Sequence, residues 1–297
     1  MSFLDPTYST TRMLTTQRPE GLKELPPSKG RVAEGGLRTK CCFKASANEK
    51  PLISIIVVVL NRANCFENCI QSILGQSYDN VEFIIIDGGS NDGSLDLLRK
   101  YSDKIDYWVS EPDQGLYYAM NKAVGIACGE WLYFIGADDV MLNCLSTVVP
   151  QLKNNQSVYY GDVYGVGSTN RYNGPFSPYR LQVNGLNHQG MFFPRGIFSA
   201  YRYDTKYKFA ADFDLNLRCL IEGGYQFVYL HELIAQYNDV DGWSSDGRPV
   251  LREFREIIHK RRGIRGYFYI GCLLLISLRD ALRCKERFEK LFLNWKW

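Results

Sequence analysis

The sequence predicts an α/β fold with a mostly parallel central sheet and helices on both of its faces. Continuous β-branched runs, such as LISIIVVVL at residues 52–60, are typical of strands buried on both faces of a parallel sheet. Segments with helical periodicity separate these runs, and strand–helix alternation at this spacing indicates βαβ units. The 297 residues are 45% hydrophobic, which is ample for a sizeable core.

The expected elements follow Pro51 in a regular order. After the first strand, residues 66–74 place apolar side chains on one helical face, and VEFIIID repeats the buried-strand pattern. The next three elements are a helix from Ser94 to Tyr101, the strand IDYWVS, and a helix from Tyr117 to Cys128, before the strand WLYFIG. Residues 155–245 hold shorter strand-like runs with Gly and Asn turns, which indicate mixed sheet and loops.

Composition divides the chain into three parts. Residues 1–50 are rich in Thr, Ser, Pro, Gly and charge without sustained periodicity, so we expect a mobile leader that the main domain does not need. Residues 51–246 carry the alternating pattern of that domain. Residues 247–297 read as a basic amphipathic helical tail, with 13 Lys or Arg and 5 Asp or Glu from Arg248 onward.

The totals favour a cytoplasmic protein. The N-terminus lacks the apolar core of a secretory signal, and no run of about 18 apolar residues indicates a spanning helix. Nine cysteines without a C-x-x-C pair argue against a zinc site or disulfide framework and fit a reducing cytosol. A net charge of +3 is too small to argue for nucleic acid, and we expect no such partner.

Acidic side chains gather where the predicted parallel strands end. Ligands of such sheets sit beyond the carboxyl ends of the strands. Those ends carry Asn61 and Arg62, then Asp87, then Asp113 in EPDQG, and finally the pair Asp138-Asp139. Carboxylates without a counter-ion would repel the negative charge of a phosphate. A divalent cation between the carboxylates and the phosphate would remove this repulsion. Mg²⁺ or Mn²⁺ takes carboxylate oxygen and keeps positions for substrate phosphates, so Asp138 and Asp139 are the candidate ligands.

Each of these positions also has a purely structural interpretation. Asp138-Asp139 is compatible with an ordinary strand-end turn, where Asp is common. Asp87 could accept from uracil N3–H or ribose hydroxyls, or simply cap the helix from Ser94. Gly115 suits a loop-to-helix junction that favours anions, whereas Asn121 after it is equally compatible with a solvated helix position.

Asp212 and Asp214 are candidates for a general base, which would take a proton from an attacking hydroxyl. At i and i+2 on a helix they point to different sides, so we expect only one to face the site. The alternative is that they are acids near a helix N-terminus, where they complement the dipole.

Taken together, the motifs resemble the family-two glycosyltransferases, an inverting family with a nucleotide-sugar-binding α/β domain. The resemblance runs from Ile53 to about Ser245 and rests on SIIVVVLNR, EFIIIDGGSNDGS, EPDQGLYYAMNKAVGIACGEWLYFIGADD, YGDVY, NHQGMFFPR and ADFDLNLR in family order. The EPDQG and GADD segments are similar to members that build bacterial exopolysaccharide, capsule and lipopolysaccharide.

The resemblance implies the nucleotide-sugar glycosyltransferase A-type fold and a role for each candidate. Asp212 matches the catalytic base, and Asp138 with Asp139 matches the end of the metal and ribose motif, with Mg²⁺ or Mn²⁺ as cofactor. His188 and Gln189 match a segment on the acceptor side. The implied donor-binding residues are Asn61, Asp87, Asp113, Asn121 and Asp138, of which Asp87 matches the acid that contacts the nucleobase.

Three positions depart from the family pattern and leave alternatives open. Gly88 and Gly136 stand where the family often has Asp or another acid, and Ala211 precedes Asp212 where Glu is common. These losses keep a second function in view, a non-catalytic sugar-nucleotide-binding or scaffold subunit of a glycan assembly complex. A nucleotidyltransferase is less favoured, because LNRANC lacks the Gly-rich basic loop that cradles a triphosphate.

The tail suggests contact with a membrane surface. An apolar block at 267–276 lies between basic clusters, and basic amphipathic helices of this kind lie in the membrane interface. Packing on the main domain or a dimer contact is the alternative. The resemblance implies a glycan or polyprenyl-diphosphate-linked acceptor, so we expect peripheral attachment to the inner face of the cell membrane.

Overall fold

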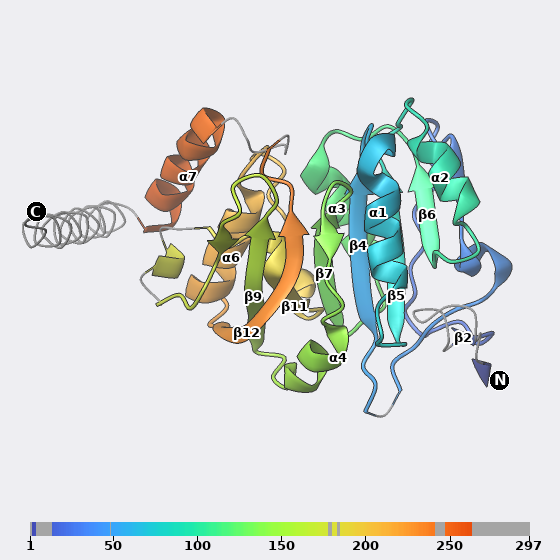
Figure 1. Cartoon of the computed structure of the whole chain (residues 1–297), viewed down its shortest axis with the longest axis horizontal. Coiled ribbons are helices and arrows are strands. Elements are labelled where there is room, and N and C mark those ends of the chain that lie inside the picture. The colour runs from blue at the N-terminus through green and yellow to red at the C-terminus, as the bar shows by residue number, and fades with distance from the viewer. Residues whose placement is uncertain are drawn as a thin grey trace, which may run out of the picture.

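A ten-stranded sheet runs through the molecule (Figure 1). The computed structural model describes residues 2–3, 14–47, 49–177, 180–182, 185–240 and 247–262. The sheet has the order β3-β6-β5-β4-β7-β11-β9-β12-β8, and β10 pairs with β9. Its strands are β3 (Ala33–Gly35), β4 (Ile53–Val59), β5 (Val81–Asp87), β6 (Tyr107–Ser110), β7 (Trp131–Gly136), β8 (Val140–Met141), β9 (Ser157–Gly165), β10 (Arg171–Tyr172), β11 (Met191–Pro194) and β12 (Gln226–Tyr237).

Four adjacent parallel strands, β6, β5, β4 and β7, form the predicted core of the sheet. Every residue of β4 and β5 is buried, as their uninterrupted apolar runs require. The chain runs outward from β4 through β5 to β6 and then returns to β7 on the other side of β4. This reversal opens a crevice at the carboxyl ends of β4 and β7, where ligands of open α/β sheets bind.

The remaining strands make the sheet mixed, as the sequence indicates. β11 is antiparallel to both β7 and β9, whereas β12 runs parallel to β9. A separate pair of short strands, β1 (Ser2–Phe3) and β2 (Leu14–Thr15), lies outside this sheet.

Helices cover both faces of the sheet and define two apolar cores. One contains side chains of α1 (Ala63–Leu74), α2 (Ser94–Lys100) and α4 (Leu145–Val148). The other contains side chains of α3 (Leu116–Ile126), α5 (Ile197–Ala200), α6 (Ala211–Ile221) and α7 (Gly247–Arg262). Short 3₁₀ turns complete the structure: η1 (Leu37–Lys40), η2 (Val149–Gln151), η3 (Arg180–Gln182) and η4 (His188–Gly190).

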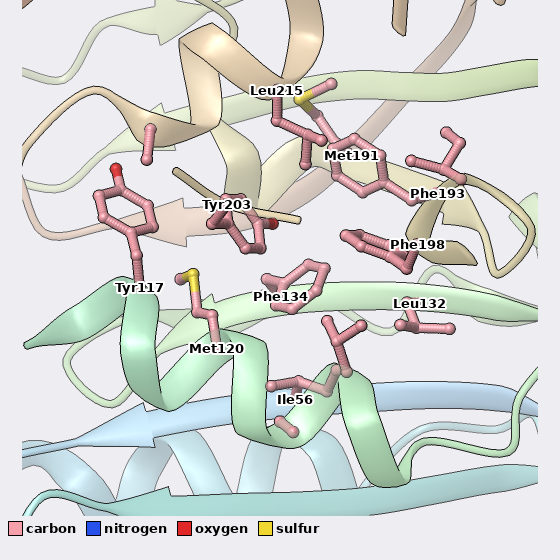
Figure 2. Close-up of a cluster of buried hydrophobic side chains, with 14 of the residues drawn as sticks. Ile56, Tyr117, Met120, Leu132, Phe134, Met191, Phe193, Phe198, Tyr203 and Leu215 are labelled. Atoms are coloured by element: carbon pink, nitrogen blue, oxygen red, sulfur yellow. The ribbon is translucent and has the colours of Figure 1, made fainter. Parts of the chain in front are cut away.

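Aromatic rings fill the core beneath α3. Tyr117 and Met120 project from α3 toward Tyr203 and Phe134 (Figure 2). The Tyr117 and Tyr203 rings stack with centroids 5.4 Å apart, and Phe134 meets Tyr203 edge-on at 5.5 Å. Such packing fixes the start of α3, which borders the crevice.

The segment before Pro51 departs from the expected mobile leader. β3 pairs antiparallel with β6 and forms one edge of the sheet. Arg38 donates to Glu82 and to the Ile126 carbonyl, the latter at 3.0 Å. Lys44 lies 3.1 Å from Asp106, and both side chains are fully or almost fully buried. This segment therefore belongs to the domain. The sequence did not indicate this, because a strand of three residues and two buried basic side chains form no periodic pattern.

The first helix of the expected tail also packs on the domain. α7 lies beside α6 at the end of the molecule opposite β3 (Figure 1). The remainder of that segment, residues 263–297 with the apolar block and its basic flanks, lies outside the described residues. Among the helices that are described, none is long and apolar enough to cross a membrane.

Candidate active site

A cavity of about 620 Å³ opens at the carboxyl ends of β4 and β7. It lies in the crevice where the strand order reverses. Most of the residues singled out in the sequence meet there, although they come from elements far apart in the chain. The ones that line it are Asn61, Asp113, Asp138, Asp139, His188, Gln189 and Asp212.

Asp138 and Asp139 follow the end of β7 after one residue and differ in their surroundings. Asp139 is 3% exposed, and its carboxylate accepts from the Asn238 amide at 2.8 Å and from Gln189 Nε2 at 2.9 Å. Burial, together with the neighbouring charge of Asp138, raises the pKa of Asp139 to about 6. Asp138 lies 3.5 Å from the Arg62 guanidinium and reaches the open cavity. Asp139 is thus held in place, while Asp138 is available to a ligand.

This pair fits a hard divalent cation. Two adjacent carboxylates, one with its charged form disfavoured by burial and by its neighbour, would be stabilised by a cation between them. A carboxylate has about four lone-pair sites, so the bonds from Asn238, Gln189 and the Gly136 amide leave Asp139 room for a further partner. No group of three or more His, Cys, Asp or Glu suited to a metal occurs among the described residues, so substrate and water oxygens would complete the shell.

The structure gives a steric reason for glycine at position 136, where the family often has an acid. A Cβ at this position would lie 2.8 Å from Asp139 Oδ2 and 2.9 Å from Asp138 Oδ1. The two carboxylates therefore occupy the space that a side chain at position 136 would need. Gly88 is similar, since a Cβ there would lie 3.1 Å from Asp113 Oδ2. The Asp113 carboxylate thus lies against the position of the second missing acid.

Of the two acids on α6, only Asp212 lines the cavity. Its Oδ1 accepts from the Phe213 amide at 2.8 Å and lies 3.2 Å from the Tyr117 hydroxyl, while Oδ2 lies 3.5 Å from His188 Nδ1. Asp214 is fully buried and pairs with Arg218 and Arg261, each at 2.8 Å. Because the two acids are at i and i+2, they point to different sides of α6. Asp212 is the candidate base, and Asp214 belongs to a structural ion pair.

Two of the predicted donor-binding residues are absent from the cavity lining. Asp87 is fully buried, where it accepts from the Ser110 hydroxyl at 2.6 Å and from the amide and hydroxyl of Ser90. Asn121 exchanges two hydrogen bonds with the Tyr203 backbone, at 2.9 and 3.1 Å. Both side chains therefore hold neighbouring backbone segments in place. A strand-end position or a family motif does not reveal whether a side chain has this structural role or contacts a ligand.

Asn61 and Asp113 lie at the cavity as predicted. Asn61 has a positive φ of 53°, a conformation that Asn tolerates better than most residues, and its side chain accepts from the Asn91 amide at 2.9 Å. Asp113 accepts from the Gly115 amide at 2.8 Å, and burial raises its pKa. The first bond joins the loops that follow β4 and β5, and the second fixes the loop that precedes α3.

Sequence reasoning missed further residues of the cavity. Arg62, which the sequence places beside Asn61 after β4, was given no role although it lines the cavity. Asn238 and Tyr237 arrive from the end of β12, and Val250 and Phe254 from α7. Nothing local to these four positions in the sequence indicates that they meet β7.

Residues 54–236 match the family model described as Glycosyl transferase family 2. The chain belongs to this family. A PGL/p-HBAD biosynthesis glycosyltransferase of Mycobacterium bovis (strain BCG / Pasteur 1173P2) is 34% identical over 226 residues, which cover 72% of this chain and 88% of the relative. An uncharacterized glycosyltransferase of Mycobacterium tuberculosis (strain ATCC 25618 / H37Rv) is 29% identical over 185 residues, covering 58% and 70%.

Solved glycosyltransferase structures share the fold of this family-two member. Staphylococcus aureus TarS superposes with a TM-score of 0.56 at 15% identity, over 75% of this chain and 43% of TarS, so the chain spans less than half of that protein. The mannosyltransferase PcManGT from Pyrobaculum calidifontis, in complex with GDP-Man and Mn²⁺, gives 0.53 at 17% identity, over 82% and 81%. The predicted A-type α/β fold is confirmed.

Proposed function

We propose that this glycosyltransferase is an inverting, metal-dependent enzyme that moves a sugar from a nucleotide-diphosphate donor to a hydroxyl of a glycan or lipid-linked acceptor in surface polysaccharide synthesis. One observation carries the proposal: a single cavity joins the carboxylates that follow β7 with Asp212 on α6. A carboxylate pair suits the metal and diphosphate, and a separate carboxylate suits the acceptor proton.

The donor would lie across the carboxyl ends of β4 and β7. Asp138 and Asp139 would hold Mg²⁺ or Mn²⁺, which when bound stabilises negative charge on the departing diphosphate. Asn61 and Asp113 border the remaining space, with Asp87 beneath them acting through Ser90 and Ser110. TarS bound to UDP-GlcNAc and PcManGT bound to GDP-Man support a nucleotide sugar as the donor class.

The transfer itself would depend on Asp212. Its carboxylate accepts the proton of the acceptor hydroxyl while that oxygen forms a bond to the anomeric carbon. The bond from this carbon to the diphosphate oxygen breaks at the same centre, and its electron pair leaves with the diphosphate. Attack from the opposite side inverts the configuration. Tyr117 and the Phe213 amide orient the carboxylate, and His188 with Gln189 would border the acceptor.

The placement of Asp212 favours an enzyme over a non-catalytic binding subunit. A protein that only binds a sugar nucleotide needs no base beside the donor. Here a partly exposed carboxylate, that of Asp212 at 21%, lines the same cavity as the metal candidates. The departures at Gly88 and Gly136 do not empty the site, because neighbouring carboxylates occupy the space at both positions.

Asp138→Ala is expected to weaken metal-stimulated binding of UDP or GDP by at least about tenfold, the range seen when metal sites lose a supporting group. Asp138 is a cleaner target than Asp139, whose three donors would lose their partner. Isothermal titration calorimetry with and without Mn²⁺ measures the effect. Asp96→Ala, which alters an exposed carboxylate on α2, is the matched control. Equal Mn²⁺ stimulation in both variants would refute the metal assignment.

Peripheral membrane attachment is part of the proposal and rests on the sequence of residues 263–297. Each Lys or Arg near an anionic surface contributes roughly 1 kcal/mol, and that segment holds seven against three acids. The full chain should sediment with anionic vesicles at low salt and be released as salt rises. A chain ending at Arg262, which keeps α7 on the domain, should stay in the supernatant. Equal sedimentation of both chains would exclude this segment as the anchor.

A further inference from the structure

Helix α7 supplies the cap that α6 lacks. The first amides of a helix have no partner within it, and Ala210 at the N-cap of α6 offers no side-chain acceptor. Glu253 of α7 supplies an acceptor at this end of α6. Its carboxylate accepts from the amide of the N-cap residue Ala210 and from the amides of Lys208 and Phe209 just before the helix, each at 2.9 Å. A negative charge at this point also complements the helix dipole. Asp212 is the second residue of the helix that is capped in this way.

Two further contacts hold α6 on the C-terminal side of Asp212. The Phe254 ring stacks on Phe213 with centroids 4.1 Å apart and planes 6° from parallel. Arg261 donates to Asp214 at 2.8 Å and to Glu222, just past the last residue of α6, at 3.1 Å. Helix α7 therefore contacts α6, the helix that carries the candidate base, from its N-cap to its C-terminal end.

A chain of contacts leads from Glu253 to the carboxylate of Asp212. Glu253 binds the Phe209 amide, and the carbonyl of Phe209 lies 3.1 Å from the Tyr117 hydroxyl. The same hydroxyl lies 3.2 Å from Asp212 Oδ1. A shift of the 208–210 backbone would therefore disturb both the start of α6 and the hydroxyl that orients its carboxylate.

We propose that Glu253 is a positioning residue for the general base, and that α7 is part of the catalytic domain and not only the first helix of a tail. This inference rests on the proposed role of Asp212. Glu253 neither binds the donor nor exchanges a proton with the acceptor. Its role is to fix the position of the Asp212 carboxylate. Misplacement of a catalytic group by about 1 Å can cost about 10²-fold in rate.

The test compares full-length Glu253→Ala, Glu253→Gln and Glu256→Ala. Glu256 lies on the same helix but pairs with Lys206 at the surface, which makes it a matched control. The substrate is whichever of a UDP-, GDP- and dTDP-hexose panel turns over fastest. Glu253→Ala should lower kcat about 10–10²-fold with the Kd for the nucleoside diphosphate unchanged. Glu253→Gln, whose amide oxygen still accepts, should recover part of the loss, and Glu256→Ala should match the wild type.

Wild-type kcat in Glu253→Ala would overturn the inference, as would equal losses of kcat and nucleotide affinity, which indicate general disruption. If Glu253→Ala fails to fold, Glu253→Asp, whose carboxylate is one methylene shorter, carries the same test with the same criteria. Asp212→Asn is assayed in parallel. Retained turnover in Asp212→Asn would refute the proposed base itself, whereas an inactive Asp212→Asn beside a fully active Glu253→Ala would refute only the positioning role.

Discussion

Asp212→Asn is expected to lower the rate of sugar transfer about 10²–10⁴-fold, the usual cost of removing a general base. The amide keeps the size of the side chain and can still meet the Tyr117 hydroxyl and the Phe213 amide through its oxygen, so the fold should persist. Binding of UDP or GDP should be unchanged, because the base acts on the acceptor. Steady-state kinetics and calorimetry on the same preparation measure the two effects.

Asp214→Asn is the matched control, because it makes the same chemical change two residues away. Asp214 is fully buried between Arg218 and Arg261. Removing one partner of a fully buried pair costs about 3–5 kcal/mol, and less is expected here because the arginine side chains are 12% and 18% exposed. This variant should melt at lower temperature and lose much less turnover than Asp212→Asn, because its carboxylate does not enter the cavity. A larger loss of kcat in Asp214→Asn than in Asp212→Asn would mean that the base is misassigned.

A chain that starts at residue 51 is expected to fold poorly or not at all. It lacks β3, Arg38 and Lys44, and leaves Glu82 and Asp106 buried without these cations. Each broken pair costs on the order of 3–5 kcal/mol, and the total stability of a domain is about 5–15 kcal/mol. Thermal unfolding followed by circular dichroism compares this chain with the full one.

A chain starting at Leu14 is the control for that truncation, because it keeps the edge strand and both cations. It should unfold at nearly the temperature of the full chain. If the chain from residue 51 also unfolds at that temperature, the buried pairs do not stabilise the domain and residues 1–50 are dispensable after all.

The parallel core could be predicted because its signal is local. Residues 53–59 and 81–87 are apolar almost without interruption, as strands buried on both faces require. The ends of such strands meet at one edge of the sheet, so the sequence alone places Asn61, Asp113 and Asp138 together, and the cavity confirms this.

The parts that could not be predicted depend on contacts between distant segments. The edge strand at Ala33–Gly35 is too short for a period, and Lys44 meets Asp106 only after folding. Similarly, Glu253 caps a helix that begins more than forty residues earlier in the chain. One clue does lie in the sequence. Arg218 follows Asp214 by four residues, the spacing of a helical ion pair, which favours Asp212 over Asp214 as the acid that faces the site.

Release of nucleoside diphosphate is the most direct test of the central claim, that one cavity binds a metal-bound sugar nucleotide beside a general base. The full chain is incubated with UDP-, GDP- and dTDP-hexoses and Mn²⁺ or Mg²⁺, with water as the acceptor. We expect release from at least one donor, loss of that release on adding a chelator, and loss of it in Asp212→Asn with nucleotide binding retained. Binding of a sugar nucleotide without release from any donor, or release unaffected by both the chelator and Asp212→Asn, would contradict it.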